Sequence, residues 1–236
     1  MEFMRLTKVC ALIPAKGFLH AKQRLSPVLG VRERELLAEA MLRDVLGQVV
    51  AARGLEATFV VTGDDRVSEI ATGSGARVIR EKEERGETGA VRFALAEMKQ
   101  RGIRAVLVLP ADIPLVRTSD VGQLVESIRE SDSASRLALL VPSHDHLGTN
   151  ALLLSPPDVI QLRFGYDSFS YHLRQVATEG LPARVIENER IALDIDEPRD
   201  LKRFLLAGER GSESHATLMQ MGLVGSFPDA QRTGSS

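Results

Sequence analysis

The chain has 236 residues, of which 44% are hydrophobic, and its 30 Lys and Arg nearly balance its 32 Asp and Glu. This length and composition are typical of one α/β domain, and the charge balance excludes a general attraction to nucleic acid or to an anionic membrane. Aromatic residues make up only 4%, which leaves few rings for base stacking. A phosphorylated ligand therefore requires a local binding site.

Apolar runs alternate with stretches of helical spacing in the first half of the chain. The predicted strands are Val9–Ile13, Thr58–Thr62, Arg77–Ile79 and Ala105–Leu109. The clearest predicted helices between them are Val31–Ala52 and Thr88–Arg101. This alternation predicts an α/β fold: a mostly parallel, twisted sheet with helices on both faces, which binds ligands beyond the carboxyl ends of its strands.

The pattern changes after Pro110. Predicted helices in the second half are Ser119–Arg129, Ser168–Glu179 and Pro198–Leu205, and predicted strands are Leu137–Val141, Thr149–Leu154, Ala183–Glu187 and Ile191–Ile195. The strands near residues 137 and 150 have no helix between them, which indicates an antiparallel element. Residues 208–236 are polar and rich in Gly and Ser, so they predict a mobile tail behind a domain of residues 1–207.

The cysteine content and the N-terminus bear on location. Cys10 is the single cysteine and lies in an apolar run, so it is expected to be a buried thiol. The N-terminal sequence MEFMRLTK lacks the apolar core of a signal peptide, and no apolar run approaches the ~20 residues that span a bilayer. These features predict a cytoplasmic protein without a membrane partner.

The first strand opens at Pro14 into a loop with three cations, Lys16, Lys22 and Arg24. The loop lacks both the GxxxxGK[ST] of a P-loop and the GxGxxG of a dinucleotide fold. Its side chains, more than its backbone amides, are therefore expected to bind phosphate. A solvated loop face is the alternative interpretation of Lys22 and Arg24.

Three carboxylates follow later predicted strands. Asp112 lies in PADIPLV after the fourth strand, and Asp194 and Asp196 alternate in ALDIDEPRDL before the helix that begins at Pro198. Magnesium takes one or two carboxylates together with phosphate oxygens and water. Asp112 with Asp194 or Asp196 therefore predicts a magnesium site. Turn formation is the alternative for Asp112, and helix capping makes Asp196 the less favoured ligand.

Together these segments resemble the MobA-like nucleotidyltransferases, and specifically the 2-phospho-L-lactate or phosphoenolpyruvate guanylyltransferases of deazaflavin coenzyme F-420 synthesis. The resemblance covers about residues 8–206 and is carried by PAKGFLHAKQRLSP, AMLRDVL, LVLPADIPLV, GTNALLLSPPD, RFGYDSFSYHL and LALDIDEPRDL. It implies a single Rossmann-like domain that joins GTP to a small phosphorylated carboxylic acid, either 2-phospho-L-lactate, phosphoenolpyruvate or 3-phosphoglycerate. The phosphate of the acid attacks the α-phosphorus of GTP, and pyrophosphate leaves.

The resemblance also implies roles for individual residues. The catalytic residues, which also contact the nucleotide, are Lys16, Lys22, Arg24 and Asp112. The acceptor acid binds at Thr149, Gly165 and Ser168, with Arg163 as an additional cation, and helix capping is the alternative for Ser168. The segment GETGAVRFAL departs from the Gly-Leu-Asn type segment of many relatives, so the candidates for contacting base or ribose are Thr88, Gly89 and Arg92.

Two other functions stay open. One is another MobA-like transferase with a different nucleotide or acceptor, although the chain lacks the LxGGxSxRMG loop of the molybdopterin and sugar branches. The other is a non-catalytic nucleotide-binding subunit, which would have no need to gather carboxylates around a metal. No nucleic-acid partner is expected, and a homodimer is left open. The histidines at 144, 146 and 172 lack convincing metal-ligand spacing and are assigned no role.

Overall fold

The computed structural model describes residues 8–83, 85–129, 136–207 and 210–223. Within them, seven strands form one sheet in the order β3-β2-β1-β4-β6-β5-β7. Their bounds are β1 (Val9–Pro14), β2 (Leu55–Thr62), β3 (Arg77–Arg80), β4 (Ala105–Val108), β5 (Leu137–Pro142), β6 (Thr149–Ser155) and β7 (Arg184–Val185). Strand β6 runs antiparallel to β4 and β5, and the other pairs are parallel. The predicted mostly parallel sheet with an antiparallel element is confirmed.

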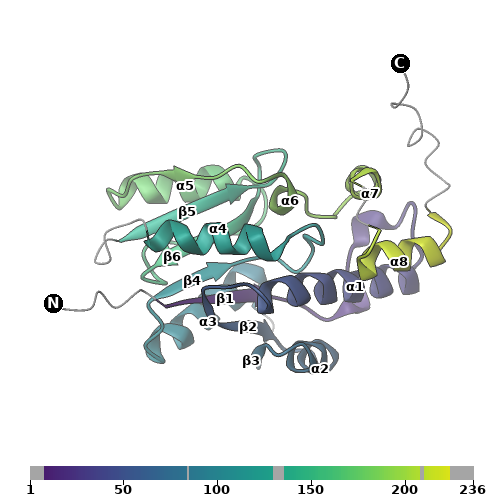
Figure 1. Cartoon of the computed structure of the whole chain (residues 1–236), viewed down its shortest axis with the longest axis horizontal. Helices are drawn as coiled ribbons and strands as arrows, with labels where there is room; N and C mark the ends of the chain where they lie inside the picture. Colours follow the sequence, from purple (N-terminus) through teal and green to yellow (C-terminus); the bar gives the residue numbers. More distant parts are fainter. Residues whose placement is uncertain (1–7, 84, 130–135, 208–209, 224–236) are drawn as a thin grey trace, which may run out of the picture.

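Helices cover both faces of this sheet, which gives the layers visible in Figure 1. One face carries α1 (Val31–Val50), α2 (Asp65–Gly73) and α4 (Thr118–Arg129), and the other carries α3 (Gly86–Gln100) and α5 (Ser168–Thr178). Alternation along β1 explains both contacts. Ala11 and Ile13 pack on the α1 side, Cys10 and Leu12 pack on the α3 side, and all four are at most 2% exposed.

The predicted strand Ile191–Ile195 is wrong. Its first residues belong to the short helix α6 (Glu189–Ala192). The side chain of Asn188 accepts hydrogen bonds from the amides of Arg190 (3.1 Å) and Ile191 (3.0 Å), and this N-cap starts a helical turn where apolar alternation suggested a strand. The predicted strand Ala183–Glu187 contributes only β7.

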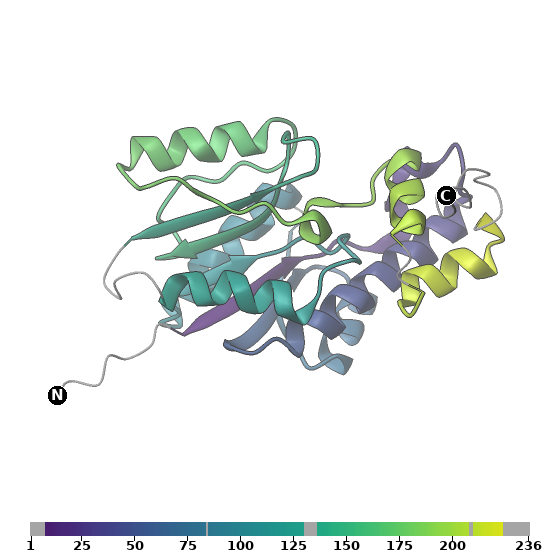
Figure 2. The same ribbon diagram turned by 45° about the horizontal axis from the view of Figure 1, so that its top comes forward.

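The C-terminal region differs from the expected tail over residues 210–223. Helix α8 (Glu213–Gln220) lies beside α1, as Figures 1 and 2 both show. Asp44 of α1 accepts hydrogen bonds from the amides of Glu213 and Ser214, each at 2.8 Å, and Leu218 is fully buried. Polar composition concealed this helix because polar residues take part in its docking: Ser214 and His215 are buried together with Leu218. Residues 208–209 and 224–236 of the predicted tail lie outside the described residues.

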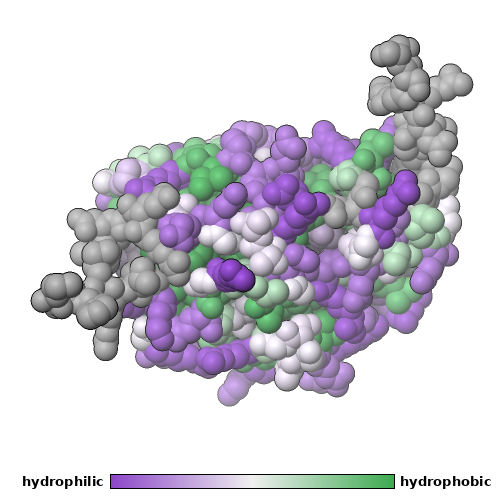
Figure 3. Space-filling model, in the orientation of Figure 1, coloured by the Kyte–Doolittle hydropathy of each residue, from purple (hydrophilic) through white to green (hydrophobic). Residues whose placement is uncertain are grey.

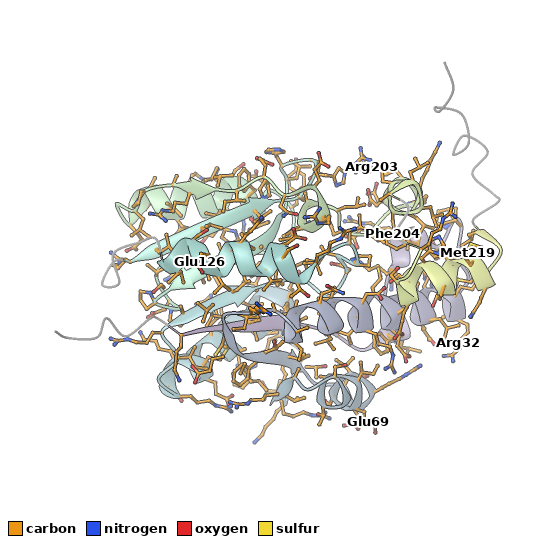
Figure 4. The ribbon with its side chains drawn as sticks, viewed as in Figure 1. Arg32, Glu69, Glu126, Arg203, Phe204 and Met219 are labelled. Atoms are coloured by element: carbon orange, nitrogen blue, oxygen red, sulfur yellow. The ribbon has the colours of Figure 1, made fainter. Side chains whose placement is uncertain are left out.

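A separate hydrophobic cluster joins α8 to segments near the cationic loop. It includes α7 (Pro198–Leu206) and the loop's 3₁₀ helix η2 (Gln23–Leu25), which follows η1 (Phe18–His20). We call it the C-terminal cluster, and its buried members are Leu25, Leu29, Leu37, Met41, Leu115, Leu193, Ile195, Leu201, Phe204 and Leu218. In Figure 4, Phe204 lies on the side of α7 toward α1, and Arg203 points away from it. The chain segments around Lys22, Asp112 and Asp194 therefore rest on one small core.

The face shown in Figure 3 is largely hydrophilic, with small hydrophobic areas scattered across it. No helix within the described residues combines the length and the apolar character needed to cross a membrane.

Candidate functional site

A buried lysine joins two of the predicted carboxylates beyond the carboxyl ends of β1 and β4. These strands are parallel neighbours, so the loop after β1 and the segment after β4 leave the sheet at the same edge. Lys22 Nζ donates to a carboxylate oxygen of Asp112 and to Asp196 Oδ1, the latter at 2.7 Å. The Lys22 side chain is only 10% exposed. We call Lys22, Asp112 and Asp196 the charged triad.

The backbone and charge of Lys22 are both fixed by this position. Its φ of 53° lies in the left-handed region, which costs a non-glycine residue about 1 kcal/mol. Burial disfavours the charged amine, but the negative charges of Asp112 and Asp196 outweigh it and raise the pKa of Lys22 above its ordinary value. Lys22 is therefore a permanent cation held against two carboxylates.

Asp194 has a different environment from Asp196. Its Oδ1 accepts a hydrogen bond from Asn150 Nδ2 at 3.0 Å. Burial, and then the charge of Asp112, raise the pKa of Asp194 to about 6. Burial also acts on Asp196, but Lys22 and then Arg24 bring the pKa of that carboxyl below its ordinary value. Asp194 is thus the carboxylate that an added cation would stabilise more.

Magnesium fits the pair Asp112 and Asp194. Oδ1 of Asp112 is buried and accepts no hydrogen bond from the described residues. Magnesium prefers hard carboxylate oxygens as ligands, and one or two of them suffice when phosphate and water complete its coordination shell. The described part of the chain holds no ready-made group of three or more metal-binding side chains. Asp196, unlike Asp194, shares the ammonium group of Lys22 with Asp112.

The other loop cations flank the charged triad. Arg24 is 71% exposed, and its Nη1 lies 3.9 Å from oxygens of both Asp196 and Glu197. Lys16 lies close enough to Glu87 to act on its charge. Desolvation by the surrounding protein, and then the charge of Asp112, raise the pKa of Glu87 to about 7, but Glu87 is exposed by its surface area, so water weakens this effect. Glu87 was not among the residues predicted from the sequence, and its position directly before Thr88 was the available signal.

The predicted acceptor residues lie together at the same edge of the sheet. Because β6 is antiparallel to β4, its first residue, Thr149, lies near the end where β4 finishes. The Thr149 amide donates to Ser168 Oγ at 3.1 Å, and Ser168 begins α5. Gly165 has φ +97°, which favours glycine at this turn. Arg163 stacks over the Tyr171 ring, with its guanidinium carbon 4.5 Å from the ring centroid.

His172 connects two of these segments, although its spacing in the sequence suggested no role. It is 0% exposed, with Nδ1 2.9 Å from Thr149 Oγ1 and Nε2 accepting the Arg163 amide at 3.2 Å. Burial, and then the positive charge of Arg163, lower the pKa of His172 to about 4. The imidazole is therefore neutral near pH 7, and only the fold reveals its contact with Thr149.

Of the three candidates in GETGAVRFAL, Thr88 has a direct connection to the acceptor half. Its Oγ1 accepts the Phe164 amide at 2.9 Å. At Gly89 an added Cβ would lie 2.6 Å from Cβ of Arg85, so the backbone there is closely packed. Arg92 instead lines a cavity of about 550 Å³ with residues such as Pro157 and Leu162.

Comparisons with known proteins identify the family of the chain. Residues 9–234 match the family described as "Guanylyl transferase CofC like", so the match extends beyond the 8–206 covered by the sequence motifs. A 2-phospho-L-lactate guanylyltransferase from Methanothermobacter thermautotrophicus is 37% identical over 86% of this chain and 86% of its own length. A phosphoenolpyruvate guanylyltransferase from Conexibacter woesei is 34% identical over 92% of this chain and 97% of its own.

Solved structures support the fold alone, because their identities are low. A cytidylyltransferase from Leptospira borgpetersenii serovar Hardjo-bovis is 17% identical, has a TM-score of 0.61, and is matched over 98% of this chain and 99% of its own. The family match over residues 9–234 and the relatives above 30% identity show that this chain belongs to the CofC-like guanylyl transferase family.

Proposed function

We propose that this protein joins GTP to a small phosphorylated carboxylic acid and releases pyrophosphate. The observation that carries the proposal is the charged triad, which faces the same sheet edge as Thr149 and Ser168. The family supports a guanylyl transfer, and relatives are named for 2-phospho-L-lactate, phosphoenolpyruvate and 3-phospho-D-glycerate. The motif resemblance connects this reaction with coenzyme F-420 synthesis.

In this reaction a phosphate oxygen of the acid bonds to the α-phosphorus of GTP, and the bond from that phosphorus to the β-phosphate bridge oxygen breaks. The protein has little covalent work: it aligns attacker and leaving group, and it neutralises charge. Lys16, Lys22 and Arg24 supply positive charge on the nucleotide side. Magnesium, held by Asp112 and Asp194, would add positive charge against the triphosphate when bound.

Lys22 has a second task in this scheme. Fixed between Asp112 and Asp196, it keeps both carboxylates close despite their mutual repulsion. Asp200 supports the arrangement, because its Oδ2 accepts the amides of Glu197 at 2.9 Å and Asp196 at 3.3 Å. The turn that carries Asp196 is thus bound to α7.

Pyrophosphate release tests the proposal. Purified protein with magnesium is assayed against a grid of four nucleoside triphosphates and the three acids named by the relatives. We expect release with GTP and at least one phosphorylated carboxylate. Release with no such acid would refute the proposal. Activity with another nucleotide or acceptor would favour the alternative MobA-like transferase. If the protein binds nucleotide but releases pyrophosphate with none of the combinations tested, a non-catalytic subunit would be favoured.

Asp112→Asn tests the metal assignment. We expect this variant to lose pyrophosphate release while it keeps its fold, as judged by circular dichroism. The matched control is Asp158→Asn, which removes a carboxylate that is 56% exposed and paired with Lys99 away from the charged triad. Near-normal turnover of Asp112→Asn would contradict the assignment. A cytoplasmic location and a homodimer stay predictions.

A further inference from the structure

The hydroxyl groups of Thr149 and Ser168 have their hydrogen-bond roles set by their neighbours. In the proposed function these two residues bind the acceptor acid, and the role of His172 rests on that function. The buried ring of His172 lies against Thr149, and both of its nitrogens have partners.

Only one tautomer of His172 fits its contacts. The amide of Arg163 can only donate, so Nε2, at 3.2 Å, accepts this hydrogen bond and carries no hydrogen. In a neutral imidazole the single hydrogen then lies on Nδ1, which is 2.9 Å from Thr149 Oγ1. Nδ1 therefore donates, and the Thr149 hydroxyl accepts.

Each hydroxyl carries one hydrogen. Since Thr149 Oγ1 accepts from His172, its own hydrogen is left for another acceptor. Ser168 Oγ accepts the Thr149 amide at 3.1 Å, so its hydrogen is left in the same way. No hydrogen bond within the described residues uses either of these hydrogens. Both residues are largely buried, Thr149 at 8% and Ser168 at 1% exposed, which makes an unused donor costly unless a ligand accepts it.

We propose that His172 is a positioning residue that turns the Thr149 hydroxyl into a donor toward an oxyanion of the acceptor acid, beside the donor of Ser168. Two adjacent donors match a carboxylate or a phosphate oxygen, which accept but do not donate. His172 does not touch the acid and acts through Thr149.

The surroundings of the ring keep it in this role. Phe164 and Tyr171 pack edge-on against His172, with ring centroids 5.5 Å and 5.7 Å away. They oppose rotation of the imidazole. Burial keeps the ring neutral, since it lowers the pKa of His172 to about 4. A charged ring would carry a hydrogen on Nε2 and would lose the Arg163 amide as a partner.

Two substitutions separate the two nitrogens. His172→Asn places an amide near Nδ1 and can keep the donor to Thr149, whereas His172→Gln places its amide near Nε2 and loses that donor. The measured quantities are kcat, the KM for the acid and the KM for GTP, by pyrophosphate release. We expect His172→Gln to raise the KM for the acid about tenfold, the equivalent of one hydrogen bond, and to leave the KM for GTP unchanged. His172→Asn should stay much closer to the wild type.

Two controls complete the set. Thr149→Val should match His172→Gln, and the double variant should be no worse than Thr149→Val alone, because both remove one interaction. Val176→Ala removes packing one turn further along α5, where Val176 is also 0% exposed. It should lower Tm without a selective change in the KM for the acid.

Nitrogen-15 NMR of His172 in the wild type should show a protonated Nδ1 and a bare Nε2 at pH 7. The opposite tautomer would overturn the proposal, as would equal increases in both KM values or a His172→Asn variant as impaired as His172→Gln. If the wild type releases no pyrophosphate with any acid, the proposed function fails and takes the acceptor role of His172 with it. The NMR result still decides the hydrogen-bond assignment.

Discussion

Replacing Lys22 by Met removes the cation of the charged triad and keeps an unbranched side chain of similar length. Asp112 and Asp196 would then face each other without Lys22 between them. Loss of one partner from a buried ion pair costs about 3–5 kcal/mol. Because the two carboxylates are 25% and 41% exposed, water offsets part of this, and we expect the free energy of unfolding to fall by about 2–3 kcal/mol.

Urea unfolding measures this loss, which corresponds to a midpoint lower by about 0.7–3 M for an m-value of about 1–3 kcal/mol/M. The double variant Lys22→Met/Asp112→Asn should recover part of the stability, since one uncompensated charge is gone. Pyrophosphate release should fall at least about a hundredfold in both, because charge neutralisation is lost. Arg24→Gln is the control for stability: its contacts are long and exposed, so its cost should stay below about 0.5 kcal/mol.

A Lys22→Met variant as stable as the wild type would refute this reasoning. So would a double variant whose loss equals the sum of the two single losses, because the ion pair would then contribute no coupling energy.

Three further predictions concern other parts of the molecule. The pKa of His172 is lowered from 6.5 to about 4 in the folded protein, so the unfolded chain binds the proton more readily. As the pH falls from about 6.5 to about 4, the free energy of unfolding measured in urea should therefore decrease by up to about 3 kcal/mol. The variant His172→Asn should not show this decrease. Leu218→Ala, at a site 0% exposed, should cost about 2–5 kcal/mol, and hydrogen exchange should rise first in α8 rather than in β1. Asp120→Ala should cost about 2–3 kcal/mol in thermal unfolding, because Asp120 is 0% exposed and accepts Arg190 Nε at 2.8 Å, while the Arg190 side chain is 39% exposed and water offsets part of the loss; a change below about 1 kcal/mol would contradict this.

The fold could be predicted well from the sequence where one local signal decided. Continuous apolar runs predicted the buried strands β1, β2 and β4, and helical spacing predicted α1 to within two residues of its end at Val50. Competing local signals caused the errors. In the segment from Asn188 to Ile195, apolar alternation favoured a strand, but the N-cap formed by Asn188 starts a short helix instead. In α8, polar composition favoured a tail, but the segment forms a helix that docks on α1 through the buried Leu218 and hydrogen bonds to Asp44.

The site shows the same division. The carboxyl ends of β1 and β4 predicted that the loop of Lys22 and the segment of Asp112 lie together, because parallel neighbours end at one edge. The sequence could not show that Lys22 binds Asp112 rather than only a phosphate, since that depends on a side-chain contact across 90 residues of sequence separation. The role of His172 could not be predicted either, because its contact with Thr149 depends on the packing of α5 on β6, which no local sequence pattern encodes.

The two halves of the candidate site rest on different hydrophobic clusters. The segments of Lys22, Asp112 and Asp194 rest on the C-terminal cluster, whereas Phe169 and Val176 of α5 pack in the cluster that α3 shares with the sheet. Under the proposed function, substitutions on α5 would therefore change the acceptor side of the candidate site without loosening the segments that carry Lys22, Asp112 and Asp194. We infer that this separation lets one scaffold diversify its acceptors, and relatives named for three different acids align over most of this chain.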